Sequence, residues 1–201
     1  MTAINTLDHS ILYWIQESLR GPALTPVMTF ITHLGDAGIF WILLTLALMA
    51  PRKTRRIGVA CAISMVIGLV VTNVVIKNWA ARIRPYDLYQ DLELIIGKQK
   101  DFSFPSGHAT NSFACAWVIF RLAPKKYGVP ALVLAILIAL SRLYVGVHYP
   151  TDILAGAAIG ILSATAAIAI VRALSRRFRG FRRFVSREQP RESTERAAAR
   201  R

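Results

Sequence analysis

Three short motifs place residues that can bind and transfer phosphate at the borders of apolar segments. The first is Lys77, six further residues, then Arg84-Pro85; the second is Pro105-Ser106-Gly107-His108; the third is Ser141-Arg142, five residues, His148, three residues and Asp152. Charged side chains are costly beside lipid, so their recurrence in an apolar chain indicates a function. The residue types predict a phosphate-handling site where helices leave a bilayer.

The cations of the first and third motifs match the needs of phosphoryl transfer. Lys77, Arg84 and Arg142 supply three positive charges. Lys77 and Arg84 are seven residues apart, so they can share a helical face if the helix persists, and Pro85 should end that helix at Arg84. Phosphoryl transfer depends mainly on positioning and on neutralising the oxygens of the transferred group. The sequence shows no carboxylate cluster suited to magnesium, so we expect the cations to replace a metal and we expect no cofactor. Alone, Lys77 or Arg84 could equally be an interfacial residue that snorkels to water.

The second motif predicts a phosphate-binding helix start. Ser106 is placed as the N-cap of an apolar segment, where free backbone N–H groups and the helix dipole favour anions. Gly107 lets a ligand approach the backbone, and His108 lies on the first turn. As an isolated tetrapeptide this would more simply be a helix cap with an interfacial histidine.

The third motif pairs a histidine with an acid. His148 and Asp152 are four residues apart, and Pro150 between them suits the start of a helix. A carboxylate at that spacing can fix the imidazole tautomer and leave the other ring nitrogen free to attack, so His148 and His108 permit a nucleophile and a general acid. The structural alternative is a helix-capping pair. His9 and His33 lack such surroundings.

The elements that position these residues are membrane helices. The chain has 201 residues, of which 54% are hydrophobic, and a mean hydropathy of +0.43. These values and several long apolar runs predict an all-α, polytopic membrane helix bundle of about six transmembrane helices, preceded by an amphipathic interfacial helix over residues 4–19. Expected spans cover residues 22–34, 39–50, 57–76, 108–122, 129–145 and 153–171.

Charge distribution predicts the orientation. Basic residues in the loop 51–56, the turn 124–126 and the C-terminal segment favour the cytoplasmic side. The loops 78–104 and 146–152 then share the outer face, so all three motifs should meet there, in the cytoplasmic membrane of the cell. We expect a phosphatase domain over 1–174 and a disordered basic cytoplasmic tail over 175–201.

The tail carries much of the net charge of +14. Topology explains this charge, and contact with anionic lipid headgroups is a modest extension. No nucleic-acid recognition module occurs, so we expect no nucleic acid as partner. Cys61 and Cys115 lie in apolar runs, so we expect them to be buried free thiols. Gly156 and Gly160 in the last span indicate close helix packing within the monomer, with a dimer interface as the alternative.

Taken together, the three motifs resemble those of the type 2 phosphatidic acid phosphatase superfamily of membrane lipid phosphatases, in order and with full spacing from residue 77 to 152. The resemblance implies a six-span bundle and a phosphohistidine intermediate. It implies that His148 is the nucleophile, Asp152 its orienting partner and His108 the proton donor to the leaving oxygen. The residues implied to hold the phosphate are Lys77, Arg84, Ser106, Gly107 and Arg142.

The expected activity is metal-independent removal of a terminal phosphate from a lipid phosphate or diphosphate. As a small chain with little beyond the helix bundle, this protein resembles undecaprenyl-diphosphate phosphatases, which act in cell-wall biogenesis. This resemblance favours undecaprenyl diphosphate as substrate. Phosphatidylglycerophosphate and phosphatidate are the alternative substrates, and a lipid phosphotransferase is an alternative reaction. A non-catalytic lipid-binding or transport protein on the same fold is an alternative of another class.

Overall fold

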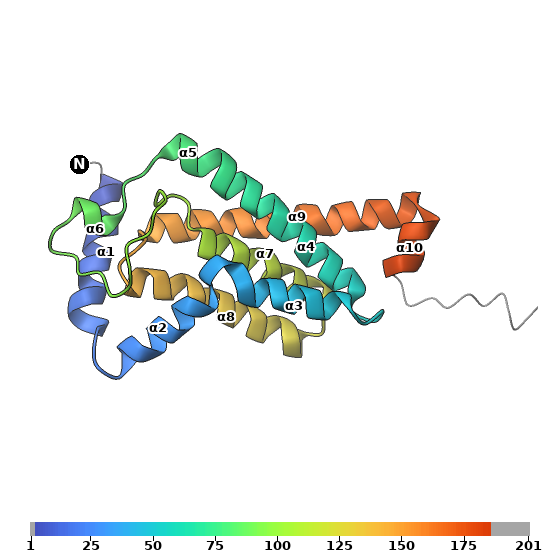
Figure 1. Ribbon diagram of the computed structural model, residues 1–201, viewed down its shortest axis with the longest axis horizontal. Coiled ribbons are helices and arrows are strands. Elements are labelled where there is room, and N and C mark those ends of the chain that lie inside the picture. The colour runs from blue at the N-terminus through green and yellow to red at the C-terminus, as the bar shows by residue number, and fades with distance from the viewer. Residues whose placement is uncertain (1–2, 186–201) are drawn as a thin grey trace, which may run out of the picture.

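The computed structural model describes residues 3–185, and all regular secondary structure in that range is helical. The longer helices run alongside one another as an elongated bundle, and α1 (Ala3–Leu19) lies across one end of it (Figure 1). The core of the bundle contains Trp41, which is fully buried and donates a hydrogen bond from Nε1 to Ser112 Oγ at 2.9 Å. Cys61 and Cys115 are buried free thiols, as predicted.

Helix α7 (Gly107–Leu122) is the centre of the bundle. It packs against α4 (Arg55–Leu69), α8 (Lys125–Tyr144) and α9 (Pro150–Arg177). Glycines of α9 permit the closest approach, because a Cβ on Gly156 would lie 2.5 Å from Ser106 O and one on Gly160 would lie 2.6 Å from Thr110 O. The prediction that these glycines pack helices within the monomer is confirmed.

Six separate spans, as expected from the sequence, are not shown. By length and composition, three stretches of the described residues could cross a membrane, namely Arg55–Leu88, Lys125–Tyr144 and Pro150–Arg177. α7 has 16 residues, or about 24 Å of helix, which is shorter than a bilayer core of about 30 Å.

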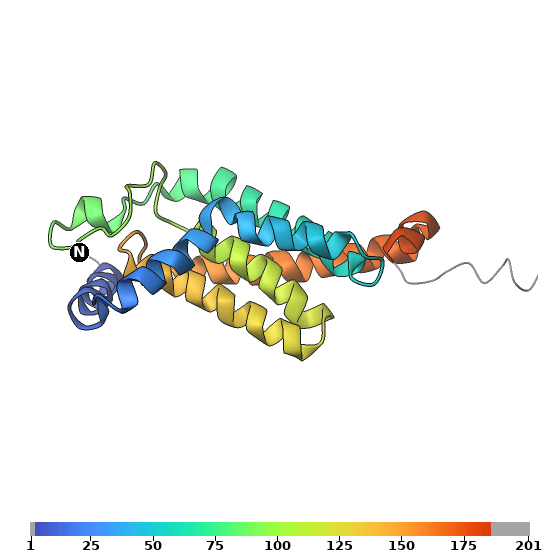
Figure 2. The same cartoon turned by 60° about the horizontal axis from the view of Figure 1, so that its bottom comes forward.

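Helices α2 (Leu24–Leu34) and α3 (Ile39–Met49) form one bent element where the sequence predicted two spans. They meet at 45° through the short helix η1 (Asp36–Gly38), and count at most as a fourth span (Figure 2). The physical reason is local. Ala37 and Gly38 have φ angles of 50° and 68°, which interrupt the helix, yet the chain bends there without reversing its direction.

The segment carrying the first motif also differs from expectation. α4 continues into a π-helix, η2 (Val70–Ile76), and a single turn, α5 (Lys77–Ala80). The sequence predicted that helix would persist until Pro85 stops it at Arg84, but it ends at Ala81, whose φ is 42°. Arg84 is extended and precedes α6 (Pro85–Leu88), in which Pro85 occupies the first turn. A helical face therefore does not align Lys77 with Arg84.

The two ends of the chain pack differently from each other. α1 is amphipathic as predicted, with Leu12 and Ile15 buried and Leu7 and Trp14 exposed. The predicted boundary at residue 174 coincides with no break, because α9 runs to Arg177 and α10 (Arg179–Val185) folds back against α9 and α4. The disorder predicted for residues 175–185 is therefore wrong, and residues 186–201 of the predicted tail lie outside the described range.

Candidate active site

The three motifs meet around one cavity of about 170 Å³. It lies at the end of the bundle that α1 crosses, where η2 leads into α5 and where α7 and α9 begin (Figure 1). Six of the eight predicted site residues line it: Lys77, Arg84, Gly107, His108, Arg142 and His148. The other two, Ser106 and Asp152, are fully buried behind this lining.

Lys77 and Arg84 converge through an acid that the sequence reading missed. Both cations are nearly buried, at 6% and 4% exposure, and both form salt bridges with Asp101. Arg84 Nη2 donates to Asp101 Oδ1 at 2.6 Å, Nε donates to the Asp101 carbonyl at 2.8 Å, and Nη1 donates to Val147 O at 2.7 Å. The π-helix before Lys77 and the extended backbone at Arg84 therefore replace the predicted helical face.

Asp101 occupies an anion-binding position at the cavity wall. Burial of its carboxyl opposes ionisation, but the hydrogen bond and charge of Lys77, together with Arg84, lower its pKa from 3.8 to about 2. The carboxylate is therefore charged at neutral pH. Its contacts show that Lys77 and Arg84 can hold an oxyanion between them.

Arg142 lines the cavity and has one unpaired donor. Its side chain is 1% exposed, and Nη1 donates to Thr32 Oγ1 at 2.7 Å. Its Nε is buried and has no hydrogen-bond partner among the described residues. A buried guanidinium nitrogen without a partner costs free energy, so this donor favours an anionic ligand.

The start of α7 forms as predicted. Ser106 is the N-cap, and its Oγ accepts a hydrogen bond from the Ala109 N–H at 3.4 Å. The N–H of Ser106 itself donates to Asp152 O at 3.1 Å, which ties the start of α7 to the start of α9. A Cβ on Gly107 would meet only Asn73 Oδ1, at 3.6 Å, so the backbone at this glycine borders open space.

His148 and Asp152 form the predicted pair. His148 is 2% exposed, and its Nδ1 lies 3.2 Å from Asp152 Oδ2. Burial of the ring lowers the pKa of His148 to about 4, with the hydrogen bond to Asp152 opposing the change. The imidazole is therefore neutral at pH 7. When Nδ1–H donates to the Asp152 carboxylate, Nε2 carries a lone pair that is available to a ligand in the cavity.

Asp152 is itself held by a network that connects four parts of the chain. Its carboxylate accepts hydrogen bonds from the Ser103 hydroxyl, from the Tyr149 N–H at 3.0 Å and from Arg82 Nη1 at 2.7 Å. Arg82 also pairs with buried Asp8 of α1 at 2.7 Å. The sequence analysis did not include Arg82 among the site residues, although its position two residues before Arg84, within the first motif, could have identified it.

His108 also has an acid partner that the sequence reading missed. His108 Nε2 lies 3.1 Å from Asp36 Oδ1, and Asp36 Oδ2 lies 2.7 Å from His33 Nδ1. The sequence placed no functional residues around His33, but His33 is connected to the site through Asp36. Gly35 permits this arrangement, because a Cβ there would clash with the His108 ring. An acid between two apolar segments was the available signal for Asp36.

No group of His, Cys, Asp or Glu in residues 3–185 is arranged to hold a metal ion. Three cations and two histidines line the cavity with a single acid, Asp101, so the lining carries an excess of positive charge that suits an anionic ligand. The arrangement can bind a phosphoryl group, attack it with an imidazole and protonate a leaving oxygen.

Comparison with known proteins gives the family. Residues 57–176, more than half of the chain, match the PAP2 superfamily. The chain belongs to the PAP2 superfamily. This confirms the resemblance seen in the three motifs and makes this PAP2 protein a multi-pass integral membrane lipid phosphatase.

Several characterised PAP2 relatives are lipid phosphatases. An undecaprenyl-diphosphatase from Sulfolobus acidocaldarius is 35% identical over 137 residues, covering 68% of this chain and 66% of that protein. Phosphatidylglycerophosphatase B from Bacillus subtilis is 33% identical over 156 residues, covering 72% and 73%. Decaprenylphosphoryl-5-phosphoribose phosphatase from Mycolicibacterium smegmatis is 34% identical over 153 residues, covering 74% and 81%.

Two solved PAP2 structures share the fold. A transmembrane phosphatidylglycerolphosphate phosphatase from Bacillus subtilis aligns with a TM-score of 0.71 and 29% identity, covering 87% of this chain and 89% of that chain. LpxE from Aquifex aeolicus aligns with a TM-score of 0.74 and 25% identity, covering 84% and 99%. The helical bundle therefore has the fold of transmembrane PAP2 structures.

Proposed function

We propose that this PAP2 protein converts undecaprenyl diphosphate to undecaprenyl phosphate and orthophosphate through a phosphohistidine intermediate. One observation carries the reaction: the neutral, acid-paired His148 lines the same small cavity as Lys77, Arg84 and Arg142. Similarity to an undecaprenyl-diphosphatase supports the choice of substrate. The reaction class is inferred from the geometry of the site, and the lipid substrate is inferred from similarity to the undecaprenyl-diphosphatase.

The proposed first step transfers the terminal phosphoryl group to His148. Nε2 forms a bond to phosphorus while the bond between phosphorus and the bridging oxygen breaks. The electron pair of that bond goes to the leaving oxygen, which takes a proton from the imidazolium form of His108 and leaves that ring neutral. Asp152 accepts the Nδ1–H of His148 and stabilises the positive charge that develops on the ring.

The proposed second step hydrolyses the intermediate. His108 takes a proton from a water molecule, the water oxygen bonds to phosphorus, and the N–P bond breaks to return the neutral imidazole. Lys77, Arg84, Arg142 and the α7 backbone at Gly107 neutralise the oxygens in both steps. Ser106 contributes indirectly, since it caps α7 and does not line the cavity.

The size of the cavity indicates that the lipid part of the substrate is recognised outside it. At about 170 Å³ it is smaller than the roughly 300–1,000 Å³ typical of small-molecule sites, so it suits a phosphate and not a whole lipid. The leaving lipid must remain outside. Selection among lipid phosphates is therefore a property of surfaces around the cavity.

A panel of purified substrates tests the proposal. Orthophosphate release is measured in detergent and excess EDTA from undecaprenyl diphosphate, phosphatidylglycerophosphate and phosphatidate. We expect undecaprenyl diphosphate to give the highest kcat/KM by at least about tenfold, a difference of about 1.4 kcal/mol. Loss of all activity in EDTA would contradict the metal-independent mechanism.

Two histidine variants test the nucleophile. His148→Ala should lower kcat by at least about a thousandfold, because the variant lacks the imidazole that is proposed to form the intermediate. His9→Ala is the matched control, since His9 of α1 does not line the cavity and its Nε2 lies 3.0 Å from Oδ2 of Asp91. Retained turnover in His148→Ala would refute the role assigned to His148.

A phosphatidylglycerophosphate phosphatase is the second candidate. It is favoured by the Bacillus subtilis phosphatase structure, which aligns over 87% of this chain. Preference for phosphatidylglycerophosphate in the panel would select this candidate. Phosphate appearing on an added alcohol in place of orthophosphate would identify a phosphotransferase.

A further inference from the structure

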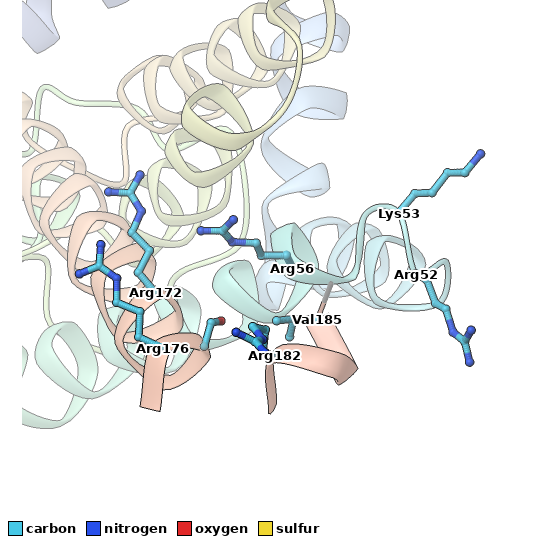
Figure 3. A pocket seen from close by; sticks show the side chains of 8 residues that line it. Arg52, Lys53, Arg56, Arg172, Arg176, Arg182 and Val185 are labelled. Atoms are coloured by element: carbon cyan, nitrogen blue, oxygen red, sulfur yellow. The ribbon is translucent and has the colours of Figure 1, made fainter. Parts of the chain in front are cut away.

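A second, strongly basic cavity lies at the end of the bundle opposite the catalytic cavity, beside the turn between α3 and α4 (Figures 1 and 3). Its volume is about 670 Å³. Six cations line it: Arg52, Lys53, Arg56, Arg172, Arg176 and Arg182. They come from two segments of the chain, the α3–α4 turn with the start of α4, and the end of α9 with α10.

The cavity is built by specific contacts that fold α10 back. Arg55 Nε donates to Met49 O at 3.0 Å and Nη1 donates to Phe184 O at 3.4 Å, so one side chain joins the α3–α4 turn to α10. The Arg55 guanidinium also lies 4.9 Å from the centre of the Phe184 ring. Val185 is 4% exposed and belongs to the hydrophobic core. These contacts hold the two basic segments as facing walls.

Figure 3 shows how the cations that line this cavity are placed. In Figure 3, Arg56 extends from the start of α4 towards α9, where Arg172 and Arg176 project from successive turns, and Arg182 lies on α10 close to Val185. Arg52 and Lys53 point outwards at the rim. Like charges four residues apart on a helix, such as Arg172 and Arg176, destabilise it by a few tenths of a kcal/mol.

None of the described acidic residues neutralises this charge. Those acids lie in α1, η1, the segment 81–106 and the start of α9, all toward the catalytic end. The preference for basic residues on cytoplasmic segments explains why each segment carries cations. It does not require that two segments share one cavity, so the convergence points to an anionic ligand.

We propose that this cavity binds the headgroup of an anionic phospholipid that carries two phosphate groups. The cavity lies at the end of membrane helices, the depth at which headgroups lie, and basic pockets between such helices suit multiply charged headgroups. Its two walls of cations match two phosphates. The catalytic cavity is at the other end of the bundle, so this site does not depend on the proposed function.

Cardiolipin is the probe, because its phosphates are diesters and lack the terminal phosphate that the catalytic site removes. Binding of cardiolipin to purified protein in detergent is measured by native mass spectrometry. The double variant Arg56→Gln/Arg176→Gln should bind roughly 30-fold more weakly, as expected for two basic contacts. The matched control is Arg179→Gln/Arg183→Gln, which removes the same charge from exposed residues of the same region that do not line the cavity.

Both double variants should keep phosphatase activity within about twofold, which shows that the fold is intact. Equal weakening of cardiolipin binding in the two double variants would overturn the proposal and assign the effect to general surface charge. A second arm titrates inorganic pyrophosphate. Binding of pyrophosphate that the first double variant loses, without binding of cardiolipin, would overturn the lipid assignment in favour of a soluble anion.

Discussion

Asp101 is the most informative residue to perturb, because it holds the cations that the substrate phosphate is expected to use. Its carboxylate pairs with both Lys77 and Arg84 at the wall of the catalytic cavity. A phosphate must displace these pairs or share the cations with a like charge. Asp101→Asn keeps the shape of the side chain and removes the competing charge.

The magnitude follows from the ion pairs of Asp101. Lowering its pKa from 3.8 to about 2 corresponds to about 2.4 kcal/mol at 1.36 kcal/mol per pH unit. The Asp101 side chain is 53% exposed, so solvent screening reduces this to about 1 kcal/mol. We therefore expect Asp101→Asn to lower KM, and the inhibition constant for orthovanadate, about fivefold.

The assay is steady-state orthophosphate release at pH 7 with an orthovanadate competition series. The matched control is Asp87→Asn, which removes the same charge from a residue that pairs with Lys98 outside the cavity. The control should leave KM within about twofold. An increase in KM for Asp101→Asn would refute the reasoning and show that Asp101 orients Lys77 and Arg84 for the phosphate.

Three further predictions concern other groups. Asp36→Asn should lower kcat by about 10–100-fold with KM within about threefold, because Asp36 holds the His108 ring; an unchanged kcat would exclude that role. Burial lowers the pKa of His148 to about 4, so protonation of this ring should not reduce kcat/KM as the pH falls from 7 to 5 and should reduce it only near pH 4. A decrease in the kcat/KM of the wild-type enzyme centred near pH 6.5 would contradict this. A cysteine replacing exposed Gln90 should react with an impermeant thiol reagent on intact cells, and labelling only after lysis would reverse the predicted orientation.

Two acids explain why the sequence could not supply the full site. Asp36 and Asp101 face His108 and the Lys77–Arg84 pair, yet neither belongs to the three motifs. Asp36 is 72 residues from His108 along the chain. Spacing arguments compare residues within one helix or turn, so they cannot place partners that only helix packing brings together. The docking of α10 was missed for the same reason, because it depends on Arg55 and the burial of Val185.

By itself, the sequence determined the membrane class, six residues that line the candidate site, the N-cap at Ser106 and the His148–Asp152 pair. These depend on composition and on spacings of a few residues, which the backbone geometry of helices and turns converts directly into position. Only the tertiary structure decided that α2 and α3 form one bent element and that Asp101 joins Lys77 to Arg84. It alone placed Asp36 beside His108. These features result from packing between distant segments, where close approach at glycines and the burial of charge select one arrangement.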